Sequence, residues 1–137
     1  NRISQPASNF EFALKNGKKM QLSDVEAQYT ILLFSNPGCA DCRNTVETLS
    51  SIVAIEGLIA EKSIAIVNID PDEDLEAWHK GTDEYPANWI NGYVTDDAFN
   101  DKYFVRAIPS LYLLDKAHNV IYKDAPLDLI TAHVETL

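Results

Sequence analysis

An almost wholly apolar run, YTILLFS at residues 29–35, is the feature that most constrains the fold of this chain. A strand with one face in solvent alternates polar and apolar residues, whereas a run like this one is typical of a strand covered on both faces. Asn36-Pro37-Gly38 ends the run, and apolar residues then recur every three or four positions over residues 39–59, which predicts one amphipathic helix. The chain must therefore bury a central strand between layers.

The rest of the chain continues the alternation of strands and helices. A β-hairpin is predicted at residues 10–22, because Asn16-Gly17 accepts the positive φ angles of a tight turn. Residues 85–93 contain two turn signals and three aromatic residues and are expected to form a packed loop. Further strands are predicted at residues 63–70, 110–114 and 120–123, and further helices at 72–80, 96–104 and 125–137. We therefore expect an α/β sandwich with a mixed sheet, in one domain over the whole chain.

Composition narrows the possible partners. With 137 residues and 46% hydrophobic residues, the chain can bury a core without needing a disulfide. Its net charge of −10 argues against nucleic acid and anionic membranes, because phosphates attract cationic surfaces. No run approaches the roughly 20 apolar residues of a membrane span, and residues 1–10 lack the features of a signal peptide. A protein or a small thiol is the expected partner.

The two cysteines of the chain, Cys39 and Cys42, lie at the predicted junction between the central strand and its helix. A helix N-terminus stabilises an anion, and a thiolate is the species that attacks disulfides. The spacing allows the second sulfur to resolve the mixed disulfide formed by the first, so we expect Cys39 to attack and Cys42 to resolve. A structural staple would close only a tiny loop, worth roughly 2 kcal/mol. A zinc half-site would need two more ligands, and the three histidines lack the usual H-x₃₋₅-H spacing.

Two segments, ILLFSNPGCADC and YFVRAIPSLYLLDKAHNVIY, resemble thioredoxin-like proteins, and the flanking regions resemble the TlpA/ResA-like branch. This resemblance implies a thioredoxin fold, with residues 1–28 as an N-terminal hairpin extension and residues 71–105 as an insertion before the strand that follows a cis-proline. It also implies that the Ile108–Pro109 bond is cis. Similar domains are generally extracytoplasmic in bacteria, occur at the C-termini of larger lipoproteins, and need no metal or cofactor besides the redox-active disulfide.

The resemblance also implies which residues form the site. Besides the two catalytic cysteines, the residues expected to bind substrate are Pro37, Gly38, Ala107, Ile108 and Pro109, and those expected to tune the redox chemistry are Ala40 and Asp41. The two positions at which related proteins carry an acid hold Leu33 and Thr45 here. A carboxylate at Asp41 would oppose stabilisation of the Cys39 thiolate by the helix, which favours a reductase.

The sequence thus predicts a monomeric, extracytoplasmic thiol–disulfide oxidoreductase that reduces protein disulfides and receives electrons from a thiol donor. The alternative is a non-catalytic interaction module of a larger protein, with an inert Cys39–Cys42 disulfide. An isomerase is a further possibility within the enzyme class, although isomerases usually need a dimerised platform. Trp78 and Trp89 fit either a local core or a substrate groove, and Trp89 is the better groove candidate because turn residues flank it.

Overall fold

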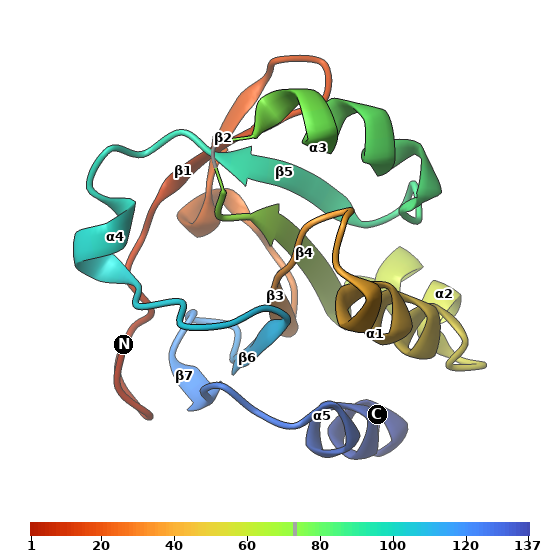
Figure 1. The fold of residues 1–137 in the computed structure, drawn as a ribbon. Helices are drawn as coiled ribbons and strands as arrows, with labels where there is room; N and C mark the ends of the chain where they lie inside the picture. Colours follow the sequence, from red (N-terminus) through yellow and green to blue (C-terminus); the bar gives the residue numbers. More distant parts are fainter. Residues whose placement is uncertain (73) are drawn as a thin grey trace.

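A single sheet of seven strands forms the centre of the computed structural model, which describes residues 1–72 and 74–137 (Figure 1). Its strand order is β2-β1-β5-β4-β3-β6-β7. The strands are β1 (Glu11–Leu14), β2 (Lys19–Gln21), β3 (Tyr29–Phe34), β4 (Ile64–Asp70), β5 (Ile90–Val94), β6 (Ser110–Leu114) and β7 (Val120–Tyr122). The helices are α1 (Ala40–Ser50), α2 (Ile55–Ala60), α3 (Leu75–Gly81), α4 (Phe99–Lys102) and α5 (Leu127–Glu135), with short 3₁₀ turns at Leu22–Asp24 and Thr82–Glu84.

The apolar strand β3 lies in the middle of the sheet, as its composition predicts. It pairs in parallel with β4 and antiparallel with β6, and β5 extends the parallel part of the sheet beyond β4. The hairpin β1–β2 joins antiparallel to the far side of β5. The predicted α/β fold, a mixed sheet flanked by helices, is confirmed.

Alternate residues of β3 enter two different cores, one on each face of the sheet. Ile31 and Leu33 pack beneath α1, α2 and α5. Leu32 and Phe34 face the opposite side, where an aromatic cluster from the N-terminal segment, α4 and the loop after α4 covers them. Because both faces are covered, no polar alternation is possible along this strand.

The apolar stripe over residues 39–59 forms two helices, so the prediction of one continuous helix is wrong. α1 ends at Ser50, and the hydroxyl groups of Ser50 and Ser51 both donate hydrogen bonds to the Glu47 carbonyl, at 3.1 and 2.7 Å. Serine side chains that bond the preceding turn compete with the backbone ladder and weaken a helix. Val53, counted in the stripe, is fully exposed in the connection to α2.

The expectation of a loop over residues 85–93 is also wrong, because its second half belongs to β5. This strand pairs with both β4 and β1, so it is an interior strand of the sheet. Gly92 permits that position: a Cβ there would lie 2.7 Å from the Ala13 carbonyl oxygen of β1. Asn91-Gly92, which suggested a turn, instead allows close approach of two backbones.

The remaining helices are shorter than their predicted ranges. α3 begins at Leu75, and the Asp74 carboxylate caps it by accepting a hydrogen bond from the Ala77 amide at 3.1 Å. Residue 73, which the predicted helix included, lies outside the described residues. Among the helices that the structure describes, none has the length and apolar character to cross a membrane.

Candidate active site

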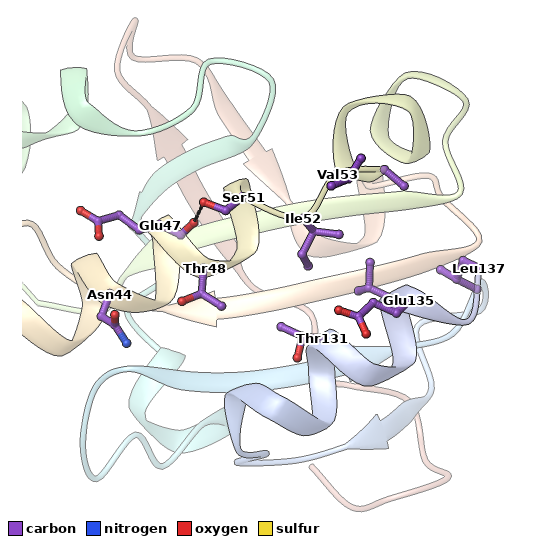
Figure 2. A pocket seen from close by; sticks show the side chains of 11 residues that line it. Asn44, Glu47, Thr48, Ser51, Ile52, Val53, Thr131, Glu135 and Leu137 are labelled. Carbon is purple, nitrogen blue, oxygen red and sulfur yellow. Dashed lines mark hydrogen bonds between the residues drawn. The ribbon is translucent and has the colours of Figure 1, made fainter.

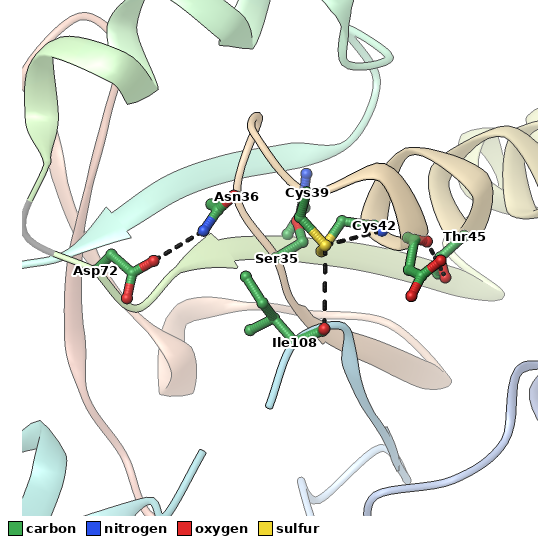
Figure 3. The surroundings of a disulfide bond; sticks show 9 residues. Ser35, Asn36, Cys39, Cys42, Thr45, Asp72 and Ile108 are labelled. Carbon is green, nitrogen blue, oxygen red and sulfur yellow. Dashed lines mark hydrogen bonds between the residues drawn. A yellow bond between two sulfur atoms is a disulfide. The ribbon is translucent and has the colours of Figure 1, made fainter. Parts of the chain in front are cut away.

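A disulfide between Cys39 and Cys42 lies where β3 gives way to α1 (Figure 3). Cys39 is the N-cap residue of α1, and its sulfur accepts a hydrogen bond from the Cys42 backbone amide at 3.1 Å. Cys42 is 1% exposed, whereas Cys39 is only partly buried. An incoming thiolate therefore has access to the sulfur of Cys39, and the same amide that bonds it would stabilise a thiolate there.

The loop before β6 faces this sulfur. The Cys39 sulfur points toward the Ile108 carbonyl oxygen, 4.0 Å away (Figure 3). The Ile108–Pro109 peptide bond is cis, and both residues are half-buried, while Ala107 is exposed. The two loops meet because Phe34, at the end of β3, pairs with Ser110, at the start of β6. The fold thus brings together residues that are nearly 70 positions apart in sequence.

The segment before Cys39 is held from its other side by the connection between β4 and α3 and by the end of α3. The Asn36 side chain donates a hydrogen bond to the Asp72 carboxylate at 2.8 Å. Pro37 packs so closely on Gly81, at the end of α3, that a Cβ at residue 81 would lie 2.2 Å from the Pro37 Cβ. Gly38 remains exposed beside Cys39. No sequence signal connects Gly81 with this segment, since a glycine at a helix end is ordinarily a C-terminal cap.

The two residues between the cysteines, Ala40 and Asp41, are both exposed in the first turn of α1. The two positions at which related proteins carry an acid lie deeper in the molecule than Ala40 and Asp41. Leu33 is completely buried in the core under α1, and Thr45 is buried with its hydroxyl donating to the Asp41 carbonyl at 3.2 Å. A base for Cys42 at either position is therefore absent.

A buried polar group that sequence reasoning missed lies at the carboxyl end of β4. Asp70, the last residue of the predicted strand, is 4% exposed, because it is still paired within the sheet. Burial raises the pKa of Asp70 to about 6, although a hydrogen bond of 2.8 Å from the Asp72 amide partly offsets this effect. By strand alternation, its side chain points to the same face as Asn68, toward the core under α1.

Neighbouring side chains extend this polar group. The Ser35 hydroxyl donates to Asn68, which in turn donates to the Asn91 side chain at 3.2 Å. Burial is the main cause of a raised pKa at Tyr85, with Ser35 and Asp70 nearby. Sequence signals for this cluster were weak, because its members come from three separate stretches of the chain.

The tryptophans lie in the core, which is the first of the two alternatives expected for them. Trp89 is 5% exposed and packs with the apolar residues beneath α1. Trp78 is 1% exposed, and its ring contacts Tyr93 of β5 at a centroid distance of 4.9 Å. The side chains of Trp78 and Trp89 thus support the sheet.

The molecule has one groove next to the loop that faces Cys39 and another farther from the disulfide, along α1. One, of about 450 Å³, is lined by residues on both sides of Pro109 and by the connection from β7 to α5. The other, of about 780 Å³, lies between the C-terminal part of α1 and α5 (Figure 2). Thr48, Ile52, Thr131 and Leu137 are among its lining residues, and neither cysteine is. Within the described residues there is no group of three or more His, Cys, Asp or Glu side chains arranged to hold a metal.

The fold and the CxxC disulfide at a helix N-terminus define a thioredoxin-like protein. Comparison of the sequence bears this out, because residues 27–120 match the Thioredoxin-like family, and the chain belongs to that family. Over 122 residues, 89% of this chain and 69% of the relative, it is 24% identical to the thiol-disulfide oxidoreductase ResA of Bacillus cereus.

Solved structures agree with this assignment. A thioredoxin-like protein from Bacteroides caccae superposes with a TM-score of 0.92 and 39% identity, covering 98% of this chain and 50% of that one. The C-terminal domain of an uncharacterized protein from Bacteroides fragilis superposes with a TM-score of 0.91 and 37% identity over 98% of both chains. The chain therefore spans half the length of the Bacteroides caccae protein and nearly all of the Bacteroides fragilis domain.

Proposed function

We propose that this chain is a thiol–disulfide oxidoreductase that reduces disulfides of protein substrates, with Cys39 as nucleophile and Cys42 as resolving thiol. The observation that carries the proposal is the partly buried Cys39 at the N-terminus of α1, whose sulfur lies 4.0 Å from the Ile108 carbonyl oxygen. Its relationship to a thiol-disulfide oxidoreductase supports the same chemistry.

The reaction would begin from the reduced, dithiol form. The Cys39 thiolate attacks one sulfur of a substrate disulfide, and the other substrate sulfur leaves as a thiolate. The Cys42 thiol then loses its proton and attacks Cys39, which releases the second substrate thiol and leaves the Cys39–Cys42 disulfide. Two electrons have moved to the substrate, and a thiol donor restores the dithiol by the reverse exchange.

Backbone groups on either side of the cysteines would hold the substrate. Ala107, Ile108 and Pro109 would present an extended backbone for pairing with a substrate strand, as in strand addition. On the opposite side, Pro37 and Gly38 would form the other edge of the contact surface. Gly38 is exposed beside Cys39, so a substrate chain can approach the sulfur from this side.

Ala40 and Asp41 would set the direction of the reaction. An exposed carboxylate at Asp41 lies in the first turn of α1 and opposes the stabilisation of an anion by the helix terminus. A thiolate that is less stabilised than in a strong oxidant leaves the disulfide relatively more stable. This favours a reductase.

The domain organisation and the cellular location of this activity are inferred from the family. We propose that residues 1–137 form one thioredoxin-like domain, with residues 1–28 as a hairpin extension and 71–105 as an insertion, located outside the cytoplasm of a bacterium. The domain would act as a monomer on protein disulfides. The net charge of −10 disfavours nucleic acid as a partner.

The reduction potential of the Cys39–Cys42 pair, measured in dithiol/disulfide buffers, tests the direction. A value near the thioredoxin figure of about −270 mV supports a reductase, and one near about −120 mV means an oxidant. A Cys42→Ser variant tests catalysis itself, because it should retain substrates as mixed disulfides on Cys39. A double variant, Cys39→Ser with Cys42→Ser, is the control. If Cys42→Ser captures no more protein than the control does, the domain is an interaction module with an inert disulfide.

A further inference from the structure

The groove of about 450 Å³ begins at the loop that faces Cys39, so its lining can contact whatever is joined to that sulfur. Residues 106, 107 and 109 form one wall, and the connection between β7 and α5 forms the other. Ile108, between residues 107 and 109, carries the carbonyl that lies 4.0 Å from the Cys39 sulfur. A chain bonded to Cys39 and extended along this loop would therefore enter the groove within two or three residues, at about 3.3 Å per residue.

One end of the groove is an aromatic platform open to solvent. Phe104 is 74% exposed, so its ring is available to contact a bound chain. The guanidinium carbon of Arg106 lies 5.0 Å from the centroid of the Phe104 ring. This stacking fixes the cation in place and leaves its N–H donors available for a ligand.

The groove is cationic, in contrast to the rest of the molecule. Arg106 and Lys123 both line it and are exposed, and neither forms an ion pair with any residue that the structure describes. The one carboxylate in the lining, Asp124, accepts a hydrogen bond from the Ser110 hydroxyl at 2.7 Å. Two cations and this one carboxylate give the lining a net charge of +1, beside the disulfide of a chain with net charge −10, and this local excess of positive charge points to an anionic ligand.

We propose that this groove selects protein substrates that carry an Asp or Glu side chain about two residues from the reacting cysteine. Arg106 would bind the carboxylate through its guanidinium fork, Lys123 would add a second positive charge, and Phe104 would pack against apolar parts of the same segment. The inference rests on the proposed function, because it concerns the substrate of the same site. It commits the groove to an acidic peptide segment of the substrate protein.

The test uses short peptides whose single cysteine is joined by a disulfide to 2-mercaptoethanol, with Asp, Asn or Lys two residues before or after the cysteine. The rate constant for attack by the reduced protein is measured for each peptide, and bis(2-hydroxyethyl) disulfide serves as an uncharged small substrate. We expect the Asp peptide of one orientation to react about threefold to fivefold faster than its Lys counterpart at low salt, from the usual strength of exposed ion pairs. This preference should vanish near 1 M salt, where the Debye length is about 3 Å.

Variants assign the preference to the groove. Arg106→Gln with Lys123→Gln should bring the Asp and Lys rates to within about the experimental error of each other, with every rate divided by that of the same variant with bis(2-hydroxyethyl) disulfide to remove any change in the reactivity of Cys39. Lys18→Gln with Lys116→Gln removes the same charge from exposed positions outside the groove and should keep the preference. Phe104→Ala should slow all peptides of the preferred orientation more than it slows the reaction with bis(2-hydroxyethyl) disulfide.

Three outcomes overturn the proposal. Equal rates for the Asp and Lys peptides in the unmodified protein would show that the groove does not select charge, although reaction with the small disulfide would leave the proposed function standing. Equal loss of preference in the two double variants would assign it to overall charge. No reaction with any disulfide would remove both the proposed function and this inference.

Discussion

Replacing Asp70 by asparagine should remove a pH dependence of stability that burial of this carboxyl creates. Asp70 is 4% exposed at the end of β4, and its pKa is raised from 3.8 to about 6, chiefly by desolvation. Asparagine has nearly the same shape and retains an oxygen that can accept the 2.8 Å hydrogen bond from the Asp72 amide. The substitution therefore changes the charge and little else.

The magnitude follows from the two pKa values. Because the folded protein binds the Asp70 proton more tightly than the unfolded chain does, stability is fully present below pH 3.8 and is lost as the pH rises through about 6. The rise in pKa corresponds to a loss of roughly 3 kcal/mol, at about 1.4 kcal/mol per pKa unit. Above pH 7 the Asp70→Asn variant should therefore be more stable than the unmodified protein by up to about 3 kcal/mol, whereas near pH 4 the two should be equal.

Urea denaturation from pH 4 to pH 8 measures this difference directly, because other titrating groups affect both proteins alike. Asp101→Asn, at an exposed position in α4, is the matched control and should give a nearly constant difference across the range. A constant difference for Asp70→Asn as well would refute the argument, since it would mean that Asp70 titrates alike in the folded and unfolded states.

Two further substitutions test the packing around the site. Gly81→Ala should destabilise the protein by about 1–3 kcal/mol, because the new Cβ would lie 2.2 Å from the Pro37 Cβ, whereas Gly57→Ala in α2, where a Cβ meets nothing within 4 Å, should stabilise it by about 0.5–1 kcal/mol. Urea denaturation distinguishes these signs, and equal effects at both glycines would contradict the close contact. Leu49→Ala, at a position with no exposure in α1, should cost about 2–5 kcal/mol, whereas Val53→Ala, fully exposed, should change stability by less than about 0.5 kcal/mol. A large effect at residue 53 would contradict the exposed position of Val53 and would favour the single long helix that the sequence predicts.

Much of the site could be predicted because its signals are local. A β-favouring run, a Pro-Gly stop and a helical stripe place Cys39 and Cys42 at a strand-to-helix junction, and these depend only on neighbours within a few residues. That Ile108 belongs to the same site as the cysteines was predicted from resemblance to a family, since nothing local in the sequence places two such distant segments side by side.

The features that the sequence did not predict correctly depend on contacts between distant segments of the chain. Asn91-Gly92 suggests a turn by itself, yet it lies in a strand because β1 approaches Gly92 closely enough to exclude a Cβ. The predicted strand through residue 70 is present, but the burial of Asp70 at its end was not predicted, because it depends on the pairing of β4 with β5.

The sequence by itself determined the order of strands and helices around the CxxC motif, because backbone propensity and apolar periodicity act over a few neighbouring residues. Only the tertiary structure decided which groups lose their water and which backbones meet: the buried carboxyl of Asp70, the contact between Pro37 and Gly81, and the cationic groove beside Cys39. Burial and close approach depend on every segment that packs at a point, and no short stretch of sequence contains that information.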